Sequence, residues 1–405
     1  MIQAIDRQMT DRENPLAGLK VLDLSRVLAG PVCTQLLADL GADVVKVERP
    51  GLGDDTRHWG PPFLPGDGLS AYFVSANRGK RSLALDLAHP AAAETLSGLI
   101  RRADVLIENF LPDAAERFGL SPQRLAELNP RLVSCSISGY GRTGPLAALP
   151  GYDLMTQAGA GLMSITGEPD GEPMKVGVAL SDVITGLYAA ISVLAGLQAR
   201  GTSGAGRAFD LALSDCTLAS LVNIAQTTLV TGERPRRWGN AHPQIVPYES
   251  LATADGLMML GVGNDAQWRR FCTAAGREDW NADPRFQTNR QRVAHRDELL
   301  PALRALIRER TTRHWGELLD SIDVPHGPVL AVDEVLAAPQ TAARQMVLPV
   351  KDRQGREYRV LGSPIHWHGE PPRRTSAPPN LGEHSDEILR EWLNYDAQKI
   401  AELRS

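Results

Sequence analysis

The chain has 405 residues, of which 43% are hydrophobic and 22% charged, the composition of an ordinary globular protein. Its length favours two domains. The formal net charge of −5, from 43 basic and 48 acidic residues, gives no electrostatic reason to expect a nucleic acid or an anionic membrane as a partner.

Residues 1–18 at the N-terminus are polar and charged, which argues against a signal peptide of ordinary form. The four cysteines are far apart in the sequence and form no CxxC pair, so neither a disulfide framework nor a zinc site is predicted. These features favour the reducing cytoplasm. The cysteines are Cys33, Cys135, Cys216 and Cys272.

The first structured segment predicts one βαβ unit. A β-branched strand over residues 21–24 is followed by a Gly30-Pro31 turn, a helix that ends at Leu40, and a second strand over 44–48. Further strands are predicted within 81–87, 104–110 and 131–138, and helices within 89–103 and 121–129. This alternation predicts an α/β fold with a mostly parallel sheet.

Residues 177–197, GVALSDVITGLYAAISVLAGL, predict a buried helix with a single carboxylate, Asp182, at its start. Taken alone, this pattern favours helix capping by Ser181 or Asp182. The uncharged run 183–199 is shorter than a bilayer span and includes polar residues, so we interpret it as a core helix.

The rest of the chain predicts a second, smaller α/β domain. A strand and an apolar helix are expected in 203–229, and Gly, Pro, Arg and His mark a linker at 230–250. Residues 256–263, 264–276 and 290–322 supply a strand and helices, while 323–329 and 361–367 are expected to be extended. We therefore predict a large domain over 1–224, a small domain over 225–335, and a return to the large domain over 336–405.

Several common cofactor motifs are missing from the sequence. The nearest match to a dinucleotide fingerprint, GVGNDA at 261–266, lacks the third glycine. The sequence has no GxxxxGK[ST], HExxH or GxSxG, and its nine histidines are scattered. We therefore predict no metal and no permanently bound cofactor.

A series of motifs in fixed order covers nearly the whole chain: LSRVLAGPVCTQLLADLGADVVKVERP, NRGKRSLALDL, ADVLIENFLPDAAERFGL, SISGYGRTGP, GYDLMTQAGAGLMSITGEPDG and LGEHSDEIL. Together they resemble the class III CoA-transferases, a family that includes formyl-CoA transferase and α-methylacyl-CoA racemase. The resemblance implies a large domain with a Rossmann-like, mostly parallel sheet, a smaller α/β domain and an interlocked homodimer. It also implies coenzyme A thioesters and small carboxylic acids as substrates.

In the family that this chain resembles, the acid at the position of Asp182 is the catalytic nucleophile. Its carboxylate attacks an acyl-CoA thioester to give a mixed anhydride, and the released thiolate then forms an aspartyl-CoA thioester. This role is compatible with a helix start, where N–H groups and partial positive charge stabilise negative oxygen atoms.

The resemblance also implies contacts with coenzyme A. Matching positions are Arg49, Asn109, Phe110 and Arg117, with Arg26 and Val27 in the first loop. The formyl-transferring member has a glutamine where this chain has Leu28 and a histidine where it has Arg26, which argues against formate as a substrate.

The racemase branch of the family uses a histidine immediately before the acid of a GHD segment. Here the segment is GYD, with Tyr152 in place of the histidine, and a phenol with a pKa near 10 is a poor base near pH 7. Transfer is therefore favoured, and proton transfer on an acyl-CoA is the alternative. Asp153 is expected either to orient the reacting groups, as Tyr152 also could, or to begin a helix.

Residues 236–268 resemble most the branch that transfers CoA between dicarboxylic acids, with succinyl-CoA as donor. The second carboxylate of such a substrate needs a cation or several hydrogen-bond donors. The candidates are Arg142, Arg237, Asn240, His242 and Tyr248. The alternative is a solvated linker charge for Arg237 and a turn residue before Pro243 for His242.

Overall fold

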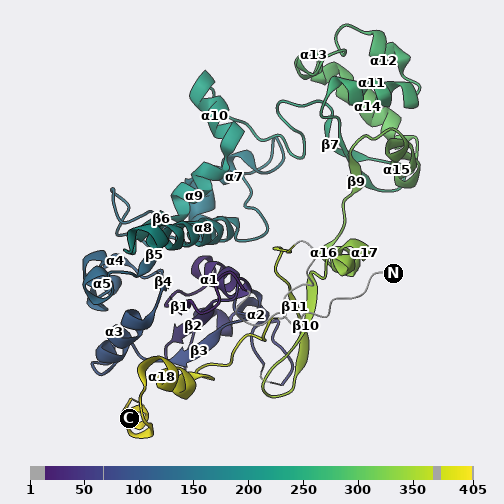
Figure 1. Ribbon diagram of the computed structural model, residues 1–405. Helices are drawn as coiled ribbons and strands as arrows, with labels where there is room; N and C mark the ends of the chain where they lie inside the picture. The colour runs from purple at the N-terminus through teal and green to yellow at the C-terminus, as the bar shows by residue number, and fades with distance from the viewer. Residues whose placement is uncertain (1–13, 67, 368–374, 404–405) are drawn as a thin grey trace. The chain divides into compact units, whose positions relative to one another are not determined.

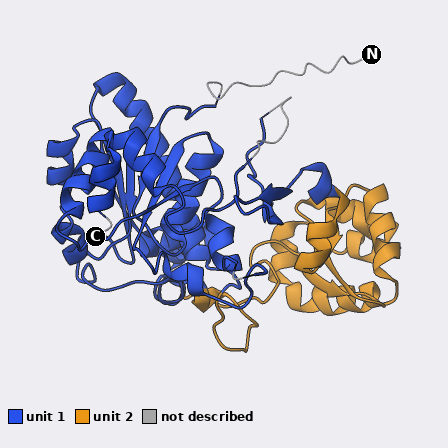
Figure 2. Cartoon of the chain, turned by 90° about the horizontal axis from the view of Figure 1, so that it is seen from below, with its two compact units in different colours: residues 1–162, 176–232, 340–405 blue, residues 163–175, 233–339 orange. Residues whose placement is uncertain are grey.

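The computed structural model describes residues 14–66, 68–367 and 375–403. The chain forms two compact units: the larger comprises residues 1–162, 176–232 and 340–405, and the smaller comprises 163–175 and 233–339 (Figure 2). The domain boundaries predicted from the sequence, between residues 224 and 225 and between 335 and 336, stay a prediction. Most of the polar N-terminal segment lies outside the described residues. Part of the Pro-rich segment that follows Trp367 also lies outside them.

The larger unit is built on a six-stranded sheet with the order β3-β2-β1-β4-β5-β6, in which every neighbouring pair is parallel (Figure 1). The predicted α/β fold with a parallel sheet is confirmed. The strand order changes direction between β1 and β4, which makes the carboxyl ends of these two strands the expected ligand site. The strands are β1 (Lys20–Asp23), β2 (Asp43–Glu48), β3 (Arg81–Ala84), β4 (Val105–Glu108), β5 (Val133–Ser138) and β6 (Ala208–Ala212).

Helices of the larger unit follow the strands as crossover connections or extend the unit beyond the sheet. They are α1 (Ala29–Asp39), α2 (Ala71–Ala76), α3 (Ala92–Arg102), α4 (Pro112–Arg117), α5 (Pro122–Leu128), α6 (Asp153–Gly159), α8 (Leu180–Ser203), α9 (Leu213–Ser220), α10 (Val222–Thr231), α18 (Ser385–Leu393), α19 (Ala397–Glu402) and the short 3-10 helix η2 (Asp55–His58). Helices α7 (Leu162–Ile165) and α17 (Pro339–Ala343) lie where the chain passes between the units.

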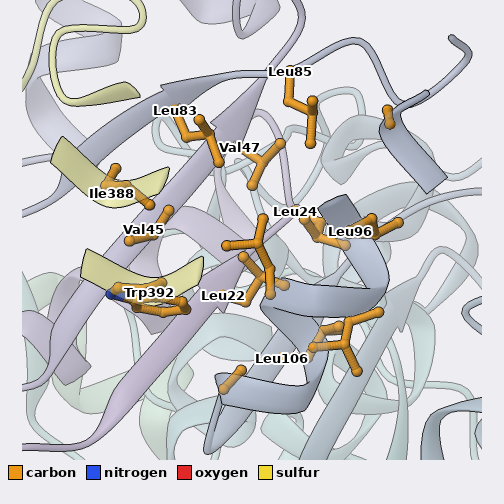
Figure 3. Close-up of a cluster of buried hydrophobic side chains, with 14 of the residues drawn as sticks. Leu22, Leu24, Val45, Val47, Leu83, Leu85, Leu96, Leu106, Ile388 and Trp392 are labelled. Atoms are coloured by element: carbon orange, nitrogen blue, oxygen red, sulfur yellow. The ribbon is translucent and has the colours of Figure 1, made fainter. Parts of the chain in front are cut away.

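One hydrophobic cluster joins the two ends of the sequence. Leu22, Val45 and Leu83 from three adjacent strands pack with Ile388 and Trp392 of α18 (Figure 3). The indole N–H of Trp392 donates to a carboxylate at the start of β2, at 3.0 Å. The C-terminal segment therefore completes one face of the sheet, and truncation of a buried tryptophan of this kind costs about 3–5 kcal/mol.

The other face of the sheet is covered by α1 and α8. Gly186 of α8 lies so close to α1 that an added Cβ would be 2.7 Å from the carbonyl oxygen of Ala29. Only glycine permits this approach. Because Asp182 lies one helical turn before Gly186, the contact brings the start of α8 next to the start of α1.

Among the described residues, α8 is the single helix long and apolar enough to cross a membrane by length and composition. The core helix of a water-soluble fold passes the same test. One side of α8 packs along α1 and against β5, and we assign that side to the core. The predicted burial of the helix is confirmed for that side only, because Ile191 is 61% exposed.

The smaller unit has an antiparallel sheet of β7 (Tyr248–Ala252), β8 (Leu257–Gly261) and β9 (His326–Pro328). Its core gathers around Trp268, Phe271 and Trp315. The single helical stretch predicted at 290–322 is wrong in detail, because Thr311 caps a new helix there. The helices are α11 (Asp265–Ala274), α12 (Glu278–Ala282), α13 (Asn289–Ala294), α14 (Arg296–Arg308), α15 (Thr312–Ser321) and α16 (Val332–Ala337).

Two further predictions about the larger unit need correction. The apolar helix expected after β6 is two helices, α9 and α10, because the chain turns at Val222, whose φ is +32°. The extended segment expected at 361–367 contributes only Leu361 to a strand. That strand belongs to an antiparallel pair that was not predicted, β10 (Val347–Lys351) and β11 (Glu357–Leu361).

Candidate active site

The loops that follow β1 and β4 meet at the carboxyl edge of the sheet. The side-chain oxygen of Asn109 accepts the N–H of Arg26 at 2.9 Å, and its amide nitrogen donates to the carbonyl oxygen of Arg26 at 2.8 Å. This paired contact joins the two loops at the point where the strand order changes direction, the usual position of ligand sites in open parallel sheets.

A cavity of about 190 Å³ lies at this junction and includes Asp182 in its wall. Its wall includes six residues that were predicted from the sequence as site residues: Arg26, Val27, Asn109, Phe110, Tyr152 and Asp182. Its remaining wall is formed by Leu28, Ala29, Asp55, Leu111, Ile137, Ser138, Gly139, Pro150, Gly151 and Leu213.

Asp182 is the third residue of α8, and neither it nor Ser181 caps that helix. The N-cap residue is Ala179, which has no side chain to accept a hydrogen bond. The expectation that Ser181 or Asp182 would cap α8 is therefore wrong. Instead, the carboxylate of Asp153, the first residue of α6, accepts the N–H of Ser181 at 2.8 Å and the side-chain amide of Gln157 at 2.7 Å.

Two further hydrogen bonds hold Ser181 at the start of α8. The hydroxyl of Thr217 in α9 donates to the hydroxyl oxygen of Ser181 at 2.8 Å, and the hydroxyl of Thr185 donates to the carbonyl oxygen of Ser181 at 2.7 Å. All three side chains are buried. The residue immediately before Asp182 is thus held by α6, α8 and α9 together.

The carboxylate of Asp182 itself has no recorded hydrogen bond or ion pair within the part of the chain that the structure describes. Burial raises its pKa to about 7, and the negative charge of Asp153 adds to the shift. At neutral pH the ionised form is therefore substantially populated, and its oxygen atoms remain available for bonding to a ligand.

The same four residues, Ala-Leu-Ser-Asp, also begin α9, where Asp215 occupies the third helical position. Asp215 is exposed, accepts a hydrogen bond from Ser214 and takes no part in the wall of the cavity. Local sequence is identical at the two helix starts. The neighbouring elements therefore create the environment that distinguishes Asp182 from Asp215.

Two features of the site were not recognised in the sequence. Tyr72 of α2 has a raised pKa, caused by burial and then by the negative charges of Asp182 and Asp153, so its phenol shares their electrostatic environment. Gly139 and Gly151 cross closely in the cavity wall, where a Cβ on Gly139 would lie 2.4 Å from the Cα of Gly151. Neither feature follows a local motif.

A second cavity, of about 280 Å³, shares Arg26 and Phe110 with the first. Arg49, predicted to contact coenzyme A, lines this second cavity. Its apolar wall includes Phe118, whose ring meets that of Phe110 edge to face with centroids 5.2 Å apart. By contrast, Arg117 is exposed on α4 and is not among the lining residues of either cavity.

The Arg142 guanidinium is already engaged in the larger unit. It pairs with the carboxylate of Glu108 at 2.6 Å and donates from Nε to the hydroxyl of Ser136 at 2.7 Å. Arg142 lines a third cavity, of about 370 Å³, that does not include Asp182. These contacts give it a structural role, and a contact with substrate stays a prediction.

The remaining carboxylate candidates lie in the smaller unit. The guanidinium of Arg237 donates to the backbone carbonyl oxygens of Glu168 and Gly171. The side-chain amide of Asn240 donates to the hydroxyl of Ser250 at 3.0 Å, and the rings of His242 and Tyr248 meet with centroids 5.5 Å apart. Their predicted contact with substrate stays a prediction.

Other reactive groups give no competing site in the described parts of the chain. No three His, Cys, Asp or Glu side chains there gather so as to hold a metal ion. All four cysteines are free and buried, and burial raises the pKa of Cys135 and of Cys272 to about 12. A thiolate nucleophile is therefore disfavoured near neutral pH.

Comparison with known proteins gives matches over nearly the whole chain. Residues 16–385 match the sequence model of CoA-transferase family III. A succinate–glutarate CoA-transferase of Agrobacterium fabrum is 45% identical over 392 residues, covering 95% of this chain and 97% of that protein. Human succinyl-CoA:glutarate CoA-transferase is 39% identical over 401 residues, covering 98% and 91%. The crystal structure of a CAIB/BAIF family protein from Brucella suis has 43% identity and a TM-score of 0.81, covering 94% and 99%.

Proposed function

The chain belongs to CoA-transferase family III, and on that premise we propose that it transfers CoA between dicarboxylic acids, with succinyl-CoA as donor and Asp182 as covalent carrier. The two relatives named for succinate or succinyl-CoA and glutarate support the dicarboxylate assignment. The observation that carries the catalytic assignment is the carboxylate of Asp182, which has no hydrogen-bond partner among the described residues and lies in the wall of a cavity at the carboxyl edge of the sheet.

The proposed reaction proceeds in balanced steps. The Asp182 carboxylate attacks the thioester carbonyl carbon of succinyl-CoA, and the carbon–sulfur bond breaks to leave a mixed anhydride and CoA thiolate. The thiolate attacks the aspartyl carbonyl carbon, which releases succinate and leaves an aspartyl-CoA thioester. An acceptor carboxylate attacks this thioester, again giving an anhydride and thiolate. The thiolate then attacks the acceptor's acyl carbon, which releases the new acyl-CoA and restores the carboxylate.

Each attack places negative charge on a carbonyl oxygen, and the start of α1 can stabilise it. Leu28 and Ala29 both line the cavity, and no acceptor for their backbone N–H groups is recorded among the described residues. Free N–H groups at a helix start, together with its partial positive charge, stabilise an oxyanion. We assign these two N–H groups that role.

The second cavity supports a site for the nucleotide part of coenzyme A. Its apolar wall and the aromatic pair of Phe110 and Phe118 suit an adenine ring, and Arg49 supplies a positive charge for phosphate. Because Arg26 and Phe110 line both cavities, one extended ligand could occupy the two at once, with its thioester near Asp182. Coenzyme A is in this scheme a substrate, with no permanently bound cofactor.

We also propose that the chain forms a homodimer, interlocked as the family resemblance implies. The supporting observation is an exposed apolar surface on α8 and α10: Ile191, Leu229 and Val230 are 61%, 80% and 75% exposed. Apolar surface of this kind usually marks an interface between proteins. Mass measurement by light scattering tests the dimer; a monomer at micromolar concentration would contradict it. The cytoplasmic location stays a prediction.

The covalent step is tested by trapping. The protein is incubated with succinyl-CoA and hydroxylamine, which converts an aspartyl anhydride or thioester into a hydroxamate that mass spectrometry locates on a peptide. We expect the label on Asp182 and its loss in Asp182→Asn. Asp215→Asn is the matched control, because its local sequence and helix position are the same; it should keep the label.

Substrate choice is tested separately by measuring transfer from succinyl-CoA to glutarate and to a monocarboxylate of similar length. Preference for the monocarboxylate would contradict the dicarboxylate assignment. The racemase alternative predicts an unlabelled Asp182 together with deuterium exchange at the substrate's α-carbon. Tyr152, the residue in place of the racemase histidine, is 62% exposed, and a phenol is a poor base for proton abstraction near pH 7.

A further inference from the structure

The backbone of Val27 adopts an unusual conformation in the wall of the Asp182 cavity. Its φ is +69°, in the left-handed region that a β-branched residue rarely occupies. Such outliers persist only where surrounding contacts impose them, and they concentrate at functional sites. The contacts that impose this one can be identified.

Three consecutive residues of the loop are each held by a side chain from another element. The ammonium of Lys46 in β2 donates to the carbonyl oxygen of Ser25 at 2.7 Å. Asn109 holds both backbone polar groups of Arg26. The N–H of Val27 donates to the two carboxylate oxygens of Asp54, at 3.2 and 3.3 Å. The last contact acts directly on the strained residue.

Asp54 is itself firmly placed. Its carboxylate pairs with Lys46 at 2.9 Å, and both side chains are fully buried. It also accepts hydrogen bonds from the N–H and the hydroxyl of Thr56, at 3.0 and 2.7 Å. Burial opposes ionisation, but Lys46 and the Thr56 hydrogen bonds outweigh it and hold the pKa of Asp54 at about 2.

We propose that Asp54 is a positioning residue for the reaction at Asp182: by accepting the Val27 N–H, it holds Val27 in the left-handed conformation and so aims the start of α1 into the cavity. Leu28 and Ala29, whose N–H groups we assign to the oxyanion, follow Val27 directly. This inference rests on the proposed role of Asp182. The competing interpretation is that Asp54 only neutralises the buried Lys46.

A double-mutant cycle separates these interpretations. Glycine adopts positive φ without strain, so Val27→Gly reduces the need for Asp54 if Asp54 acts through Val27. The measured quantity is the single-turnover rate constant for acylation of Asp182 by succinyl-CoA, in protein shown to be folded by circular dichroism. Asp54→Ala removes both oxygen atoms that accept the Val27 N–H, and with valine at position 27 it should slow acylation about 100-fold.

In the Val27→Gly background, Asp54→Ala should slow acylation by a factor about tenfold smaller, since glycine adopts the left-handed conformation without the strain that a β-branched residue carries. The control is Gln345→Gly, which replaces another residue with positive φ, +47°, outside the residues that line the Asp182 cavity. It should not change the effect of Asp54→Ala. Equal slowing by Asp54→Ala with valine and with glycine at position 27 would overturn the proposal.

Two further measurements keep the result interpretable. If Asp54→Ala does not fold, Thr56→Val replaces it, because it removes only the hydroxyl that donates to Asp54. It should slow acylation less, and Val27→Gly should again reduce the effect; equal slowing with valine and with glycine at position 27 overturns the proposal. If the wild-type protein is not labelled at Asp182, the proposed function fails, whereas labelling of the wild type and of Asp54→Ala at equal rates refutes only the role of Asp54.

Discussion

The carboxylate of Asp153 accepts the backbone N–H of Ser181 at 2.8 Å, one residue before Asp182. Asp153 thereby supplies the first turn of α8 with the hydrogen-bond acceptor that Ala179 lacks. The same negative charge raises the pKa of Asp182. One side chain therefore both stabilises the helix and tunes the acid at its start, and substitutions can separate the two effects.

Asp153→Asn keeps a side-chain oxygen for the Ser181 N–H but removes the charge. We expect the pKa of Asp182 to fall below about 7, so that the ionised form persists to lower pH. The acid limb of the pH profile of kcat/KM for succinyl-CoA should move to lower pH. An unchanged limb would show that Asp153 does not influence the reacting acid.

Asp153→Ala removes the acceptor as well as the charge. It should shift the acid limb in the same direction and also lower the free energy of unfolding by about 1 kcal/mol, the usual cost of losing a helix cap. Denaturant unfolding of the two variants measures the difference. Equal stability of Asp153→Asn and Asp153→Ala would contradict the capping role.

Asp182→Asn should abolish turnover while stabilising the folded protein at alkaline pH. The folded protein binds the Asp182 proton more tightly than the unfolded chain, since its pKa rises from 3.8 to about 7. Stability therefore falls as pH rises from 4 to 7, by at most roughly 4 kcal/mol, and the asparagine variant escapes this loss. The gain in Tm over wild type should be larger at pH 8 than at pH 5; a gain independent of pH would contradict the raised pKa.

Arg49→Gln tests the proposed nucleotide site. It should raise KM for succinyl-CoA about tenfold with little change in kcat, because contacts far from the reacting atoms stabilise the ground state and the transition state alike. Arg117→Gln is the matched control, since Arg117 is exposed and is not among the residues that line the two cavities. An equal effect of the two substitutions would contradict the placement of the nucleotide.

Gly139→Ala should disrupt the wall of the Asp182 cavity. The added Cβ would meet the backbone of Gly151 at 2.4 Å, and overpacking of this kind costs about 1–3 kcal/mol or more. Gly159→Ala is the control, because an added Cβ has no neighbour within 4 Å there and alanine favours the helix. Chemical denaturation should show a loss for the first variant and none for the second.

The sequence was informative where local pattern determines structure. The β-branched runs around Val21 and Val45 mark strands because the parallel sheet buries both their faces. The Gly30-Pro31 turn predicted before the next helix is wrong, because both residues belong to the first turn of α1, where proline is tolerated. The turn at Val222 and the new start at Thr311 were missed, because an apolar or charged periodic run does not reveal where tertiary packing bends it.

Local sequence is an even weaker guide to the candidate site. Ala-Leu-Ser-Asp begins both α8 and α9, and only contacts with distant residues separate Asp182 from Asp215. The acceptor for Ser181 comes from Asp153, 28 residues earlier in the chain. The sequence around Tyr72, a short apolar helix, predicts an ordinary core residue. Only the folded structure shows that Tyr72 shares the electrostatic environment of Asp182.

The Asp182 carboxylate accepts no hydrogen bond from the described residues. This bears on the stability of the fold while a group is covalently attached to Asp182. An acyl group or CoA attached to Asp182 displaces no recorded contact of the folded chain, because α8 is held at Ser181 instead. The modified and the resting protein can therefore share one backbone arrangement. On the proposed mechanism, the covalent intermediate would therefore keep the fold of the resting protein until the second substrate binds.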